Sequence, residues 1–355
     1  MGELRLMKGN EALAEAAIRA GMDAYFGYPI TPQSEVLEYL TREARARTGA
    51  VILQAESEVA SINMVYGAAG AGARVMTSSS SPGMSLMQEG ISYIAGAELP
   101  CLLVNVNRGG PGLGTIQPSQ GDYFQSTKGG GHGDYRLIVL APATVQEMSD
   151  HVLEGFELAE KYRNPVLILT DGALGQMMEK VELRDQLDRS TRVVPDWATV
   201  GKPTDREHNV ITSLFIKPEE MEVVNLRLQE KYKVIEANEI RCQTIDVDDA
   251  DVVLVAYGLS ARISRKVMEL CRAQGRKVGV IRPITLWPYP YQVISDVAAH
   301  AKAFLTVELN AGQMVEDVRL AVNGRCPVSH YGRMGGIIPS PEEIVGVVEQ
   351  IYSSL

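Results

Sequence analysis

The chain has 355 residues, of which 45% are hydrophobic, so it is long enough to form two domains with sizeable cores. Its formal net charge of −10 argues against non-specific binding to nucleic acid or to an anionic membrane surface, since both partners are negatively charged. No uninterrupted apolar stretch reaches the roughly 18 residues that a membrane span needs. We expect no signal peptide, because the N-terminal sequence MGELRLMKGNEAL enters a helix pattern directly.

Four scattered cysteines bear on the cellular compartment and on redox cofactors. They are Cys101, Cys242, Cys271 and Cys326, and no pair forms a C-x-x-C motif. This spacing argues against a disulfide framework and against a four-thiolate iron–sulfur cluster within this chain alone. We therefore expect a cytoplasmic protein.

The first 172 residues alternate strand and helix patterns. We expect Asn10 to cap a first helix that Gly21 ends, and Thr31 to cap a second helix with Pro32 in its first turn. Strands are predicted at 24–28, 51–55, 74–79, 101–107, 137–142 and 165–171, and further helices at 32–47, 57–71, 84–95 and 145–161. Because these strands are apolar throughout and separated by helices, the pattern predicts an α/β fold with a parallel sheet covered on both faces.

From about residue 183 to residue 250 the alternation breaks. The stretch is rich in charge, contains Pro195, Pro203 and Pro218, and is predicted to form a solvated helix over 219–239. We interpret it as a linker that wraps around its neighbours. The alternation resumes at residue 251, with strands at 251–258, 277–284, 303–309 and 328–331 and helices at 260–274, 291–301, 313–323 and from 341 onward. The predicted domains are thus 1–182 and a smaller 251–355, joined by 183–250.

Special residues follow four of the strands in the first domain. The segments are Y-P-I-T-P, E-S-E, S-S-P-G and R-G-G-P-G-L-G, the last of which leads to a loop with G-G-G-H-G-D. In a parallel sheet the carboxyl ends of the strands share one edge, where ligands bind. Taken singly, each has a structural explanation: Ser57 as a helix cap, Arg108 as a surface charge, His132 as a loop histidine, the glycines as turn residues. Together they favour a site at this edge.

Several well-known motifs are missing from the sequence. It has no G-x-x-x-x-G-K-[ST], and the glycines between 109 and 114 do not follow the G-x-G-x-x-G spacing. It also has no H-E-x-x-H, no G-x-S-x-G and no Cys/His metal spacing, so we predict no metal site in this chain. These observations argue against a generic nucleotide-binding protein that uses NAD or ATP.

Several motifs, taken in order, resemble the 2-oxoacid:ferredoxin oxidoreductases. They are G-Y-P-I-T-P, Q-A-E-S-E-V-A-S-I-N-M-V-Y-G-A-A-G-A-G, T-S-S-S-S-P-G-M-S-L-M-Q-E-G and A-G-A-E-L-P-C. Their order and spacing are similar to the thiamine-diphosphate pyrimidine domain of that family, and R-P-I-T-L-W-P-Y-P resembles its transketolase C-terminal-like domain. The stretch from Asn107 to Asp134 looks most like the subunit of branched-chain (2-oxoisovalerate) enzymes. Gln33 departs from the family, in which many members have serine there.

The resemblance implies roles for individual residues. Glu58 matches the glutamate that promotes the imino tautomer of the coenzyme's aminopyrimidine, and Glu56, two residues away, is the competing candidate. Partial desolvation at a helix start would let such a carboxyl share a proton. Thr31 matches a residue that contacts the 2-oxoacid, and Arg108 an arginine near substrate or cofactor that could pair with the substrate carboxylate. Further cofactor contacts are expected from Tyr28, Pro29, Ile30, Ser80 and Gly83.

The resemblance also implies partner chains. Family members hold the diphosphate and Mg²⁺ through a G-D-G motif followed by Asn, whereas here neither Gly121-Asp122 nor Gly133-Asp134 is followed by glycine. We therefore expect an alpha-type subunit that shares thiamine diphosphate with a diphosphate-binding beta-type subunit, together with a small gamma-type subunit and a ferredoxin-like iron–sulfur subunit. Coenzyme A would be the co-substrate, ferredoxin the electron acceptor, and homodimerisation within the complex is expected.

The expected reaction is the oxidative decarboxylation of a branched-chain 2-oxoacid to acyl-CoA and CO₂. The alternatives left open are a 2-oxoglutarate- or pyruvate-specific enzyme and a non-catalytic assembly subunit of the same fold.

Overall fold

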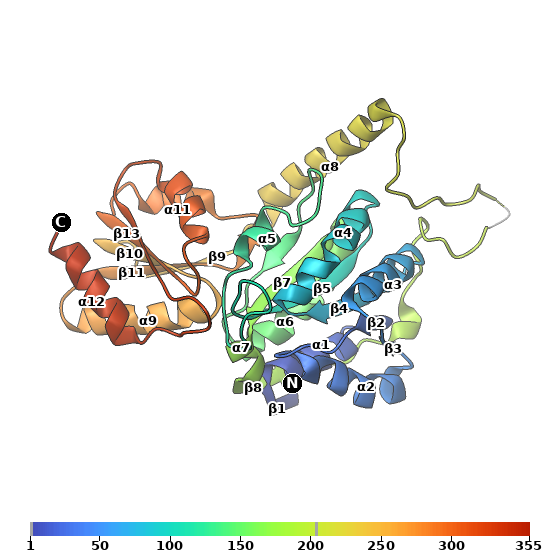
Figure 1. The fold of residues 1–355 in the computed structure, drawn as a ribbon, viewed down its shortest axis with the longest axis horizontal. Coiled ribbons are helices and arrows are strands. Elements are labelled where there is room, and N and C mark those ends of the chain that lie inside the picture. Colours follow the sequence, from blue (N-terminus) through green and yellow to red (C-terminus); the bar gives the residue numbers. More distant parts are fainter. Residues whose placement is uncertain (1–2, 203–204) are drawn as a thin grey trace.

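Two large β-sheets organise the chain in the computed structural model, which describes residues 3–202 and 205–355 (Figure 1). The first sheet has the strand order β12-β6-β7-β5-β4-β2-β3, and all of its neighbours are parallel except β12 and β6. Its strands are β2 (Ala24–Gly27), β3 (Val51–Gln54), β4 (Val75–Ser79), β5 (Cys101–Asn107), β6 (Ile138–Leu140), β7 (Pro165–Asp171) and β12 (Thr285–Trp287). Every residue of β4, β5 and β7 is buried, as the continuous apolar runs predict.

The second sheet is smaller and has the order β14-β13-β10-β11-β9. Its strands are β9 (Cys242–Ile245), β10 (Val252–Val255), β11 (Val278–Pro283), β13 (Ala303–Glu308) and β14 (Val328–Gly332), of which only β9 runs antiparallel to its neighbour. β9 therefore belongs to this sheet although it lies within the segment expected as a linker. Conversely, β12 lies between β11 and β13 in the chain, but it pairs with β6 and forms an edge of the first sheet.

Helices cover both faces of the first sheet. Helices α3 (Glu58–Gly70) and α4 (Ser81–Gly96) pack against each other on one face, and α1 (Gly9–Arg19), α2 (Ser34–Thr48) and α6 (Val145–Tyr162) lie on the other (Figure 1). The second sheet is flanked by α9 (Gly258–Ala273), α10 (Tyr291–Val297), α11 (Met314–Val322) and α12 (Pro341–Tyr352). The predicted α/β class with two parallel-dominated sheets is confirmed. No helix among residues 3–202 and 205–355 is both long and apolar enough to cross a membrane.

Sequence patterns missed the shorter elements. These are β1 (Glu3–Lys8), β8 (Met178–Leu183), β9, β12, α5 (Tyr123–Thr127), α7 (Gly172–Gln176) and a 3₁₀ turn at Arg189–Thr191. The expectation that the chain enters a helix directly at its N-terminus is wrong, because 3–8 forms a strand that pairs antiparallel with β8. Paired residues of the two strands, from Lys8 with Met178 to Glu3 with Leu183, are far apart in the chain, so no local pattern could reveal the pairing.

Both predicted caps in the N-terminal part are wrong. Helix α1 begins at Gly9, so Asn10 is inside it, and the Asn10 amide instead donates to the Pro32 carbonyl oxygen at 2.8 Å. Helix α2 begins at Ser34, with Gln33 rather than Thr31 at the N-cap. The reason is a turn that comes first: the backbone N–H of Gln33 donates to the Ile30 carbonyl at 3.0 Å, so the chain is still turning at Thr31.

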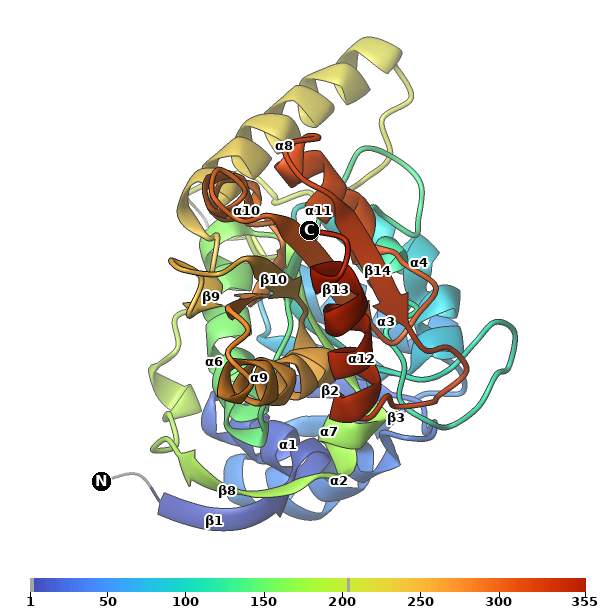
Figure 2. The same ribbon diagram turned by 90° about the vertical axis from the view of Figure 1, so that its left-hand side faces the viewer.

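The part of the chain that connects the two domains contains a long, mostly solvated helix, α8 (Pro218–Asn238), as the pattern predicts. Figure 2 shows α8 running along one side of the molecule. Its buried residues include Tyr232, whose ring meets Trp287 of β12 edge-on at 5.7 Å. The preceding segment contacts the first domain, where the backbone N–H of Thr199 donates to the Gly70 carbonyl at 2.9 Å. Pro203 lies outside the described residues.

A short segment after β5 joins the two halves of the molecule. The Gln120 side chain donates to the Tyr257 carbonyl at 2.9 Å and accepts from the Leu309 backbone N–H at 2.9 Å. Tyr123 donates to the buried carboxylate of Asp317 at 2.6 Å. Because these groups are buried and paired across the two domains, they fix the second domain against the carboxyl edge of the first sheet.

Candidate functional site

The carboxyl ends of β2, β4 and β5 meet at one edge of the first sheet, and the predicted site residues gather there. Glu58 and Gly83 are in contact with each other, and Arg108 is bonded to the backbone of Thr31. Ser80 precedes α4, and Tyr28, Pro29 and Ile30 follow β2 on the way to Thr31. The sheet topology thus unites segments that are separated by some 80 residues in the chain.

Glu58 is the first residue of α3 and is only 6% exposed. The helix is capped by Ser57, whose hydroxyl accepts from the Ala60 backbone N–H at 3.2 Å, so the cap predicted for Ser57 is confirmed. Glu56 lies before the cap and is exposed. The geometry therefore distinguishes the two acids: Glu58 is held inward by the helix start, whereas Glu56 faces solvent.

The Glu58 carboxylate packs against Gly83 in the first turn of α4. A Cβ atom at Gly83 would lie 2.6 Å from Glu58 Oε1, which is closer than real Cβ contacts. No hydrogen bond to this carboxylate is found among residues 3–202 and 205–355. Neither Glu58 oxygen is among the fully enclosed polar atoms that lack a partner, so the carboxylate stays accessible and can accept a hydrogen bond from a ligand.

Other buried polar atoms at the same edge also have no partner in the described part of the chain. They are Gln33 Nε2, Ser79 Oγ, Ser80 Oγ, Asn107 Nδ2 and Arg108 Nε. Gln33 is fully buried and its other amide atom, Oε1, accepts from the Ser78 hydroxyl at 2.6 Å. Because buried polar groups in folded proteins are almost always satisfied, such a cluster indicates a place that a ligand or water completes.

Arg108 is 7% exposed and is held by the backbone of two loops. Its guanidinium donates to the Thr31 carbonyl at 2.9 Å and to the Leu113 carbonyl at 3.0 Å. Arg108 is therefore not an exposed surface residue. Its two hydrogen bonds hold the loop after β2 and the glycine-rich loop after β5 next to each other. Its unpaired Nε leaves one donor for a further partner.

Thr31 is exposed, and its hydroxyl makes no hydrogen bond with the described residues. It lines a groove of about 570 Å³ together with Glu35, Ile116, Gln117 and, from the second domain, Ile338. The neighbouring Tyr28 is 36% exposed. Side chains of the segment 28–31 are thus accessible to solvent at the opening of the site, where a substrate or cofactor could contact them.

Sequence reasoning missed Asp122 as a site residue, because its G-D motif lacks the following glycine. The Asp122 carboxylate accepts from the Ser81 hydroxyl at 2.6 Å and from the Asn105 amide at 2.8 Å. Burial raises the pKa of this carboxyl, and the hydrogen bonds from Ser81 and Asn105 oppose the rise. Asp122 lies in a second groove, of about 450 Å³, whose walls include Arg108 and second-domain residues such as Leu309 and Met334. Only the tertiary structure brings these walls together.

His132 does not join the site. Its side chain is exposed, and its backbone carbonyl accepts from the Ser92 hydroxyl at 2.7 Å near the far end of α4. This agrees with the structural explanation of a loop histidine. No group of three or more His, Cys, Asp or Glu side chains in the described ranges could hold a metal ion.

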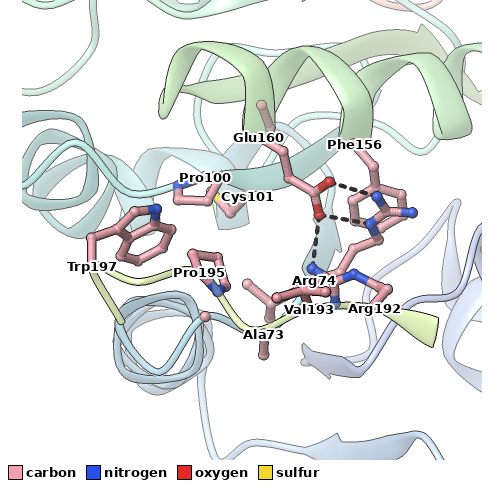
Figure 3. Close-up of a pocket in the computed structure, with 13 residues that line it drawn as sticks. Ala73, Arg74, Pro100, Cys101, Phe156, Glu160, Arg192, Val193, Pro195 and Trp197 are labelled. Atoms are coloured by element: carbon pink, nitrogen blue, oxygen red, sulfur yellow. Dashed lines mark hydrogen bonds and ion pairs between the residues drawn. The ribbon is translucent and has the colours of Figure 1, made fainter. Parts of the chain in front are cut away.

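A further hollow, of about 260 Å³, lies at the opposite, amino-terminal edge of the sheet (Figure 3). Arg74 and Arg192 both bond to the Glu160 carboxylate, at 2.6 Å and 2.9 Å, in a hollow that Pro195 and Trp197 also line. All of these charges are paired with each other. The network therefore fastens the segment after β8 to the first domain.

The site fits the pyrimidine half of thiamine diphosphate. Glu58 offers a buried carboxylate without a protein partner, and Gly83 leaves the space beside it that a side chain would fill. Ser80 adds a buried hydroxyl without a partner.

Comparisons with known proteins agree with this geometry. The family described as "Pyruvate flavodoxin/ferredoxin oxidoreductase, thiamine diP-bdg" matches residues 15–245, and "Pyruvate:ferredoxin oxidoreductase core domain II" matches residues 250–344. The chain is 50% identical to ketoisovalerate oxidoreductase subunit VorB of Methanothermobacter thermautotrophicus, over 98% of this chain and 97% of that protein. It is 36% identical to 2-oxoglutarate synthase subunit KorA of Methanocaldococcus jannaschii, over 96% of this chain and 98% of that protein.

Solved structures are similar as well. A 2-oxoglutarate:ferredoxin oxidoreductase from Magnetococcus marinus, solved with 2-oxoglutarate, coenzyme A and succinyl-CoA bound, matches with a TM-score of 0.87 at 29% identity. The match covers 98% of this chain but only 65% of that one. A split-gene transketolase matches with a TM-score of 0.61 at 14% identity, which shows a shared fold alone.

Proposed function

The chain belongs to the pyruvate flavodoxin/ferredoxin oxidoreductase family, and on that premise we propose that it is the alpha-type subunit of a 2-oxoacid:ferredoxin oxidoreductase. The complex would decarboxylate a branched-chain 2-oxoacid, transfer the acyl group to coenzyme A and pass the electrons to ferredoxin. The observation that carries the proposal is the buried Glu58 carboxylate, which has no partner among the described residues and lies beside Gly83. Residues 1–182 would form the pyrimidine-type domain, 183–250 the linker and 251–355 the transketolase C-terminal-like domain.

Glu58 would bond to a ring nitrogen of the coenzyme's pyrimidine and share a proton with it. Its burial at a helix start holds the carboxyl in one orientation. When bound, thiamine diphosphate supplies the nucleophilic carbon that adds to the 2-oxo group and accommodates the electrons left by CO₂. Ser80, Gly83 and the backbone of 28–30 would form the walls around the ring.

Thr31 and Arg108 would hold the 2-oxoacid. The Thr31 hydroxyl is free to donate to the substrate carboxylate, and Arg108 Nε is a buried donor without a partner. Because the two other donor groups of Arg108 are bound by backbone carbonyls, the guanidinium is fixed in direction before substrate arrives. A preorganised donor costs no reordering on binding.

The grooves around Thr31 and Arg108 support a substrate with one carboxylate. Among the described residues that line the two grooves, Arg108 is the sole cation, whereas Glu35, Glu38 and Asp122 contribute acidic groups. The walls also include apolar side chains such as Pro82, Leu309 and Met334. A second carboxylate, as in 2-oxoglutarate, would need another cation, so the lining favours an aliphatic tail, in agreement with the 50% identity to ketoisovalerate oxidoreductase subunits.

The surface around Glu58 supports a diphosphate-binding partner subunit. Exposed apolar side chains lie on α3, α4 and the edge strand β3, namely Val51, Leu53, Val59, Met64, Leu86 and Tyr93. An exposed edge strand with apolar side chains is a surface that proteins normally cover. We propose that the beta-type subunit covers this surface and brings the diphosphate and Mg²⁺ to the site. The small gamma-type and iron–sulfur subunits, ferredoxin and homodimerisation within the complex complete the proposed assembly.

A cytoplasmic location is part of the proposal. All four cysteines are unpaired, and Cys101 and Cys271 are buried, which supports a reducing compartment.

The test is reconstitution. The chain co-expressed with its candidate partner subunits should form acyl-CoA from 2-oxoisovalerate with a redox dye as electron acceptor, and more slowly from 2-oxoglutarate or pyruvate. A complex that turns over none of the three 2-oxoacids would favour the non-catalytic assembly subunit. Turnover by the isolated chain would contradict the shared coenzyme site.

A further inference from the structure

The start of α4 leaves a space at Gly83 that two oxygen atoms share. Glu58 Oε1 lies 2.6 Å from the point where a Cβ atom at Gly83 would stand, and Ser79 Oγ lies still closer to it. The Ser79 hydroxyl and the Glu58 carboxylate therefore face the same small volume, although one ends β4 and the other begins α3.

Ser79 is fully buried, and its hydroxyl makes no hydrogen bond with any described residue. The Glu58 carboxylate also has no donor in the described part of the chain. The two groups lie close enough that a hydrogen bond between them forms after a small movement of either side chain, which would satisfy the buried Ser79 hydroxyl. The carboxylate oxygen nearest the space at Gly83 is Oε1, so Oε2 can take another partner.

We propose that Ser79 is a positioning residue for Glu58, whose hydroxyl stays bonded to the carboxyl in both of its protonation states. The proposal rests on the proposed function for the role of Glu58. A hydroxyl can donate to Oε1 both in the carboxylate and in a carboxyl that carries its proton on the other oxygen. When Glu58 holds its proton at that other oxygen, Oε1 is the carbonyl oxygen and still accepts from the Ser79 hydroxyl, so this hydrogen bond is kept. The residue keeps Glu58 in one rotamer throughout.

Gly83 makes this pairing sterically possible. A side chain there would occupy the space between the two oxygens and push them apart. Thr77 provides an internal comparison: it lies two residues earlier on the same face of β4, is fully buried and also has an unpaired hydroxyl, but it does not touch the Gly83 position.

The experiment reads the hydrogen bond directly, in the full chain without coenzyme. The infrared band of the Glu58 carboxyl is assigned as the band that Glu58→Gln removes. Ser79→Ala is expected to shift this band, because one hydrogen bond to the carboxyl is lost, and Thr77→Val is expected to leave it in place. If the alanine variant does not fold, Ser79→Cys keeps the volume, replaces the hydroxyl by a weak donor and should give the same shift.

Kinetics of the assembled complex give the second measurement. Ser79→Ala should lower kcat roughly fivefold to tenfold with little change in KM for the 2-oxoacid, since the substrate contacts are untouched. A band that is unchanged in both Ser79 variants, or shifted equally by Thr77→Val, would overturn the pairing. The band shift is measured without turnover, so the two proposals can fail separately. If Glu58→Gln left turnover intact, the proposed function would be wrong. The band shift caused by Ser79→Ala would still report the Ser79–Glu58 hydrogen bond.

Discussion

The guanidinium of Arg108 donates to the backbone carbonyl of Thr31 at 2.9 Å, which joins the loop after β5 to the loop after β2. These are the two residues that the sequence assigns to the 2-oxoacid. This hydrogen bond links the two residues, because the Arg108 guanidinium holds the backbone of Thr31 in place. Substitution of Arg108 should therefore also disturb the backbone at Thr31.

Replacement of Arg108 should weaken substrate binding. Arg108→Ala removes a buried cation and both backbone ties, so kcat/KM for the 2-oxoacid should fall by roughly 10²-fold or more. Arg108→Lys should recover only part of this loss, since an ammonium cannot reproduce the guanidinium fork. Steady-state kinetics of the reconstituted complex measure the effect. Arg42→Ala, at an exposed arginine on α2, is the control and should leave kcat/KM unchanged.

Removal of the Thr31 hydroxyl should affect binding without affecting stability. Thr31→Ala should reduce kcat/KM for the 2-oxoacid roughly 10- to 100-fold, as expected for one hydrogen bond to a charged group. Its melting temperature should match the wild type, because Gln33 and not Thr31 occupies the N-cap of α2. Thr31→Ser keeps the hydroxyl and should retain most activity. Equal kcat/KM for the alanine variant would exclude a substrate contact at Thr31.

Replacement of Glu58 by glutamine should abolish most turnover. An amide cannot share a proton with the coenzyme, so kcat should fall at least about a hundredfold. The free energy of unfolding should change little, because the amide has nearly the same shape, its oxygen can still accept a hydrogen bond, and no ion pair is lost. Glu56→Gln is the matched control at an exposed position and should behave as wild type. The reverse pattern would assign the role to Glu56.

A methyl group at Gly83 should disturb the site. Gly83→Ala places Cβ against Ser79 and Glu58, and the overpacking should cost about 1–3 kcal/mol in unfolding free energy and reduce thiamine diphosphate affinity. Gly67 is the matched control, since it lies inside α3 and a Cβ atom there would meet open space. Gly67→Ala should stabilise the chain by about 0.5–1 kcal/mol. Chemical denaturation and calorimetry measure both quantities.

The buried carboxyl of Asp171 should make stability depend on pH. Burial raises its pKa from 3.8 to about 6, against the opposing hydrogen bonds from the Leu174 and Ala173 backbone. The folded chain therefore binds more protons than the unfolded chain between these values, and the stabilisation present below about pH 4 is lost as pH rises through about 6. The full change is about 3 kcal/mol.

Asp171→Asn should remove this slope, because the amide does not titrate and can still cap α7. Urea unfolding at several pH values between 4 and 7 measures the difference between variant and wild type. Asp248→Asn, at an exposed position in the loop after β9, is the control and should keep the slope. A variant at Asp171 with the wild-type slope would contradict the assignment.

Much of the site could be predicted from the sequence because its residues belong to contiguous motifs. Glu58 follows a strand and a capping serine, and both features are local, so the helix start at Glu58 could be predicted. For Thr31 the sequence predicts the correct loop but the wrong local role. The turn from Ile30 to Gln33 depends on packing of Pro32 against Gly172, which belongs to another strand end.

The sequence by itself determined the α/β class, the central strands and the motifs around Glu58, Thr31 and Arg108, because burial of continuous apolar runs and helix capping act over a few residues. Only the tertiary structure decided which acid is buried, that Ser79 and Glu58 both lie at Gly83, and that β9 joins the second sheet whereas β12 joins the first. These relations join segments far apart in the chain. Their contacts depend on strand order and packing, which no local periodicity encodes.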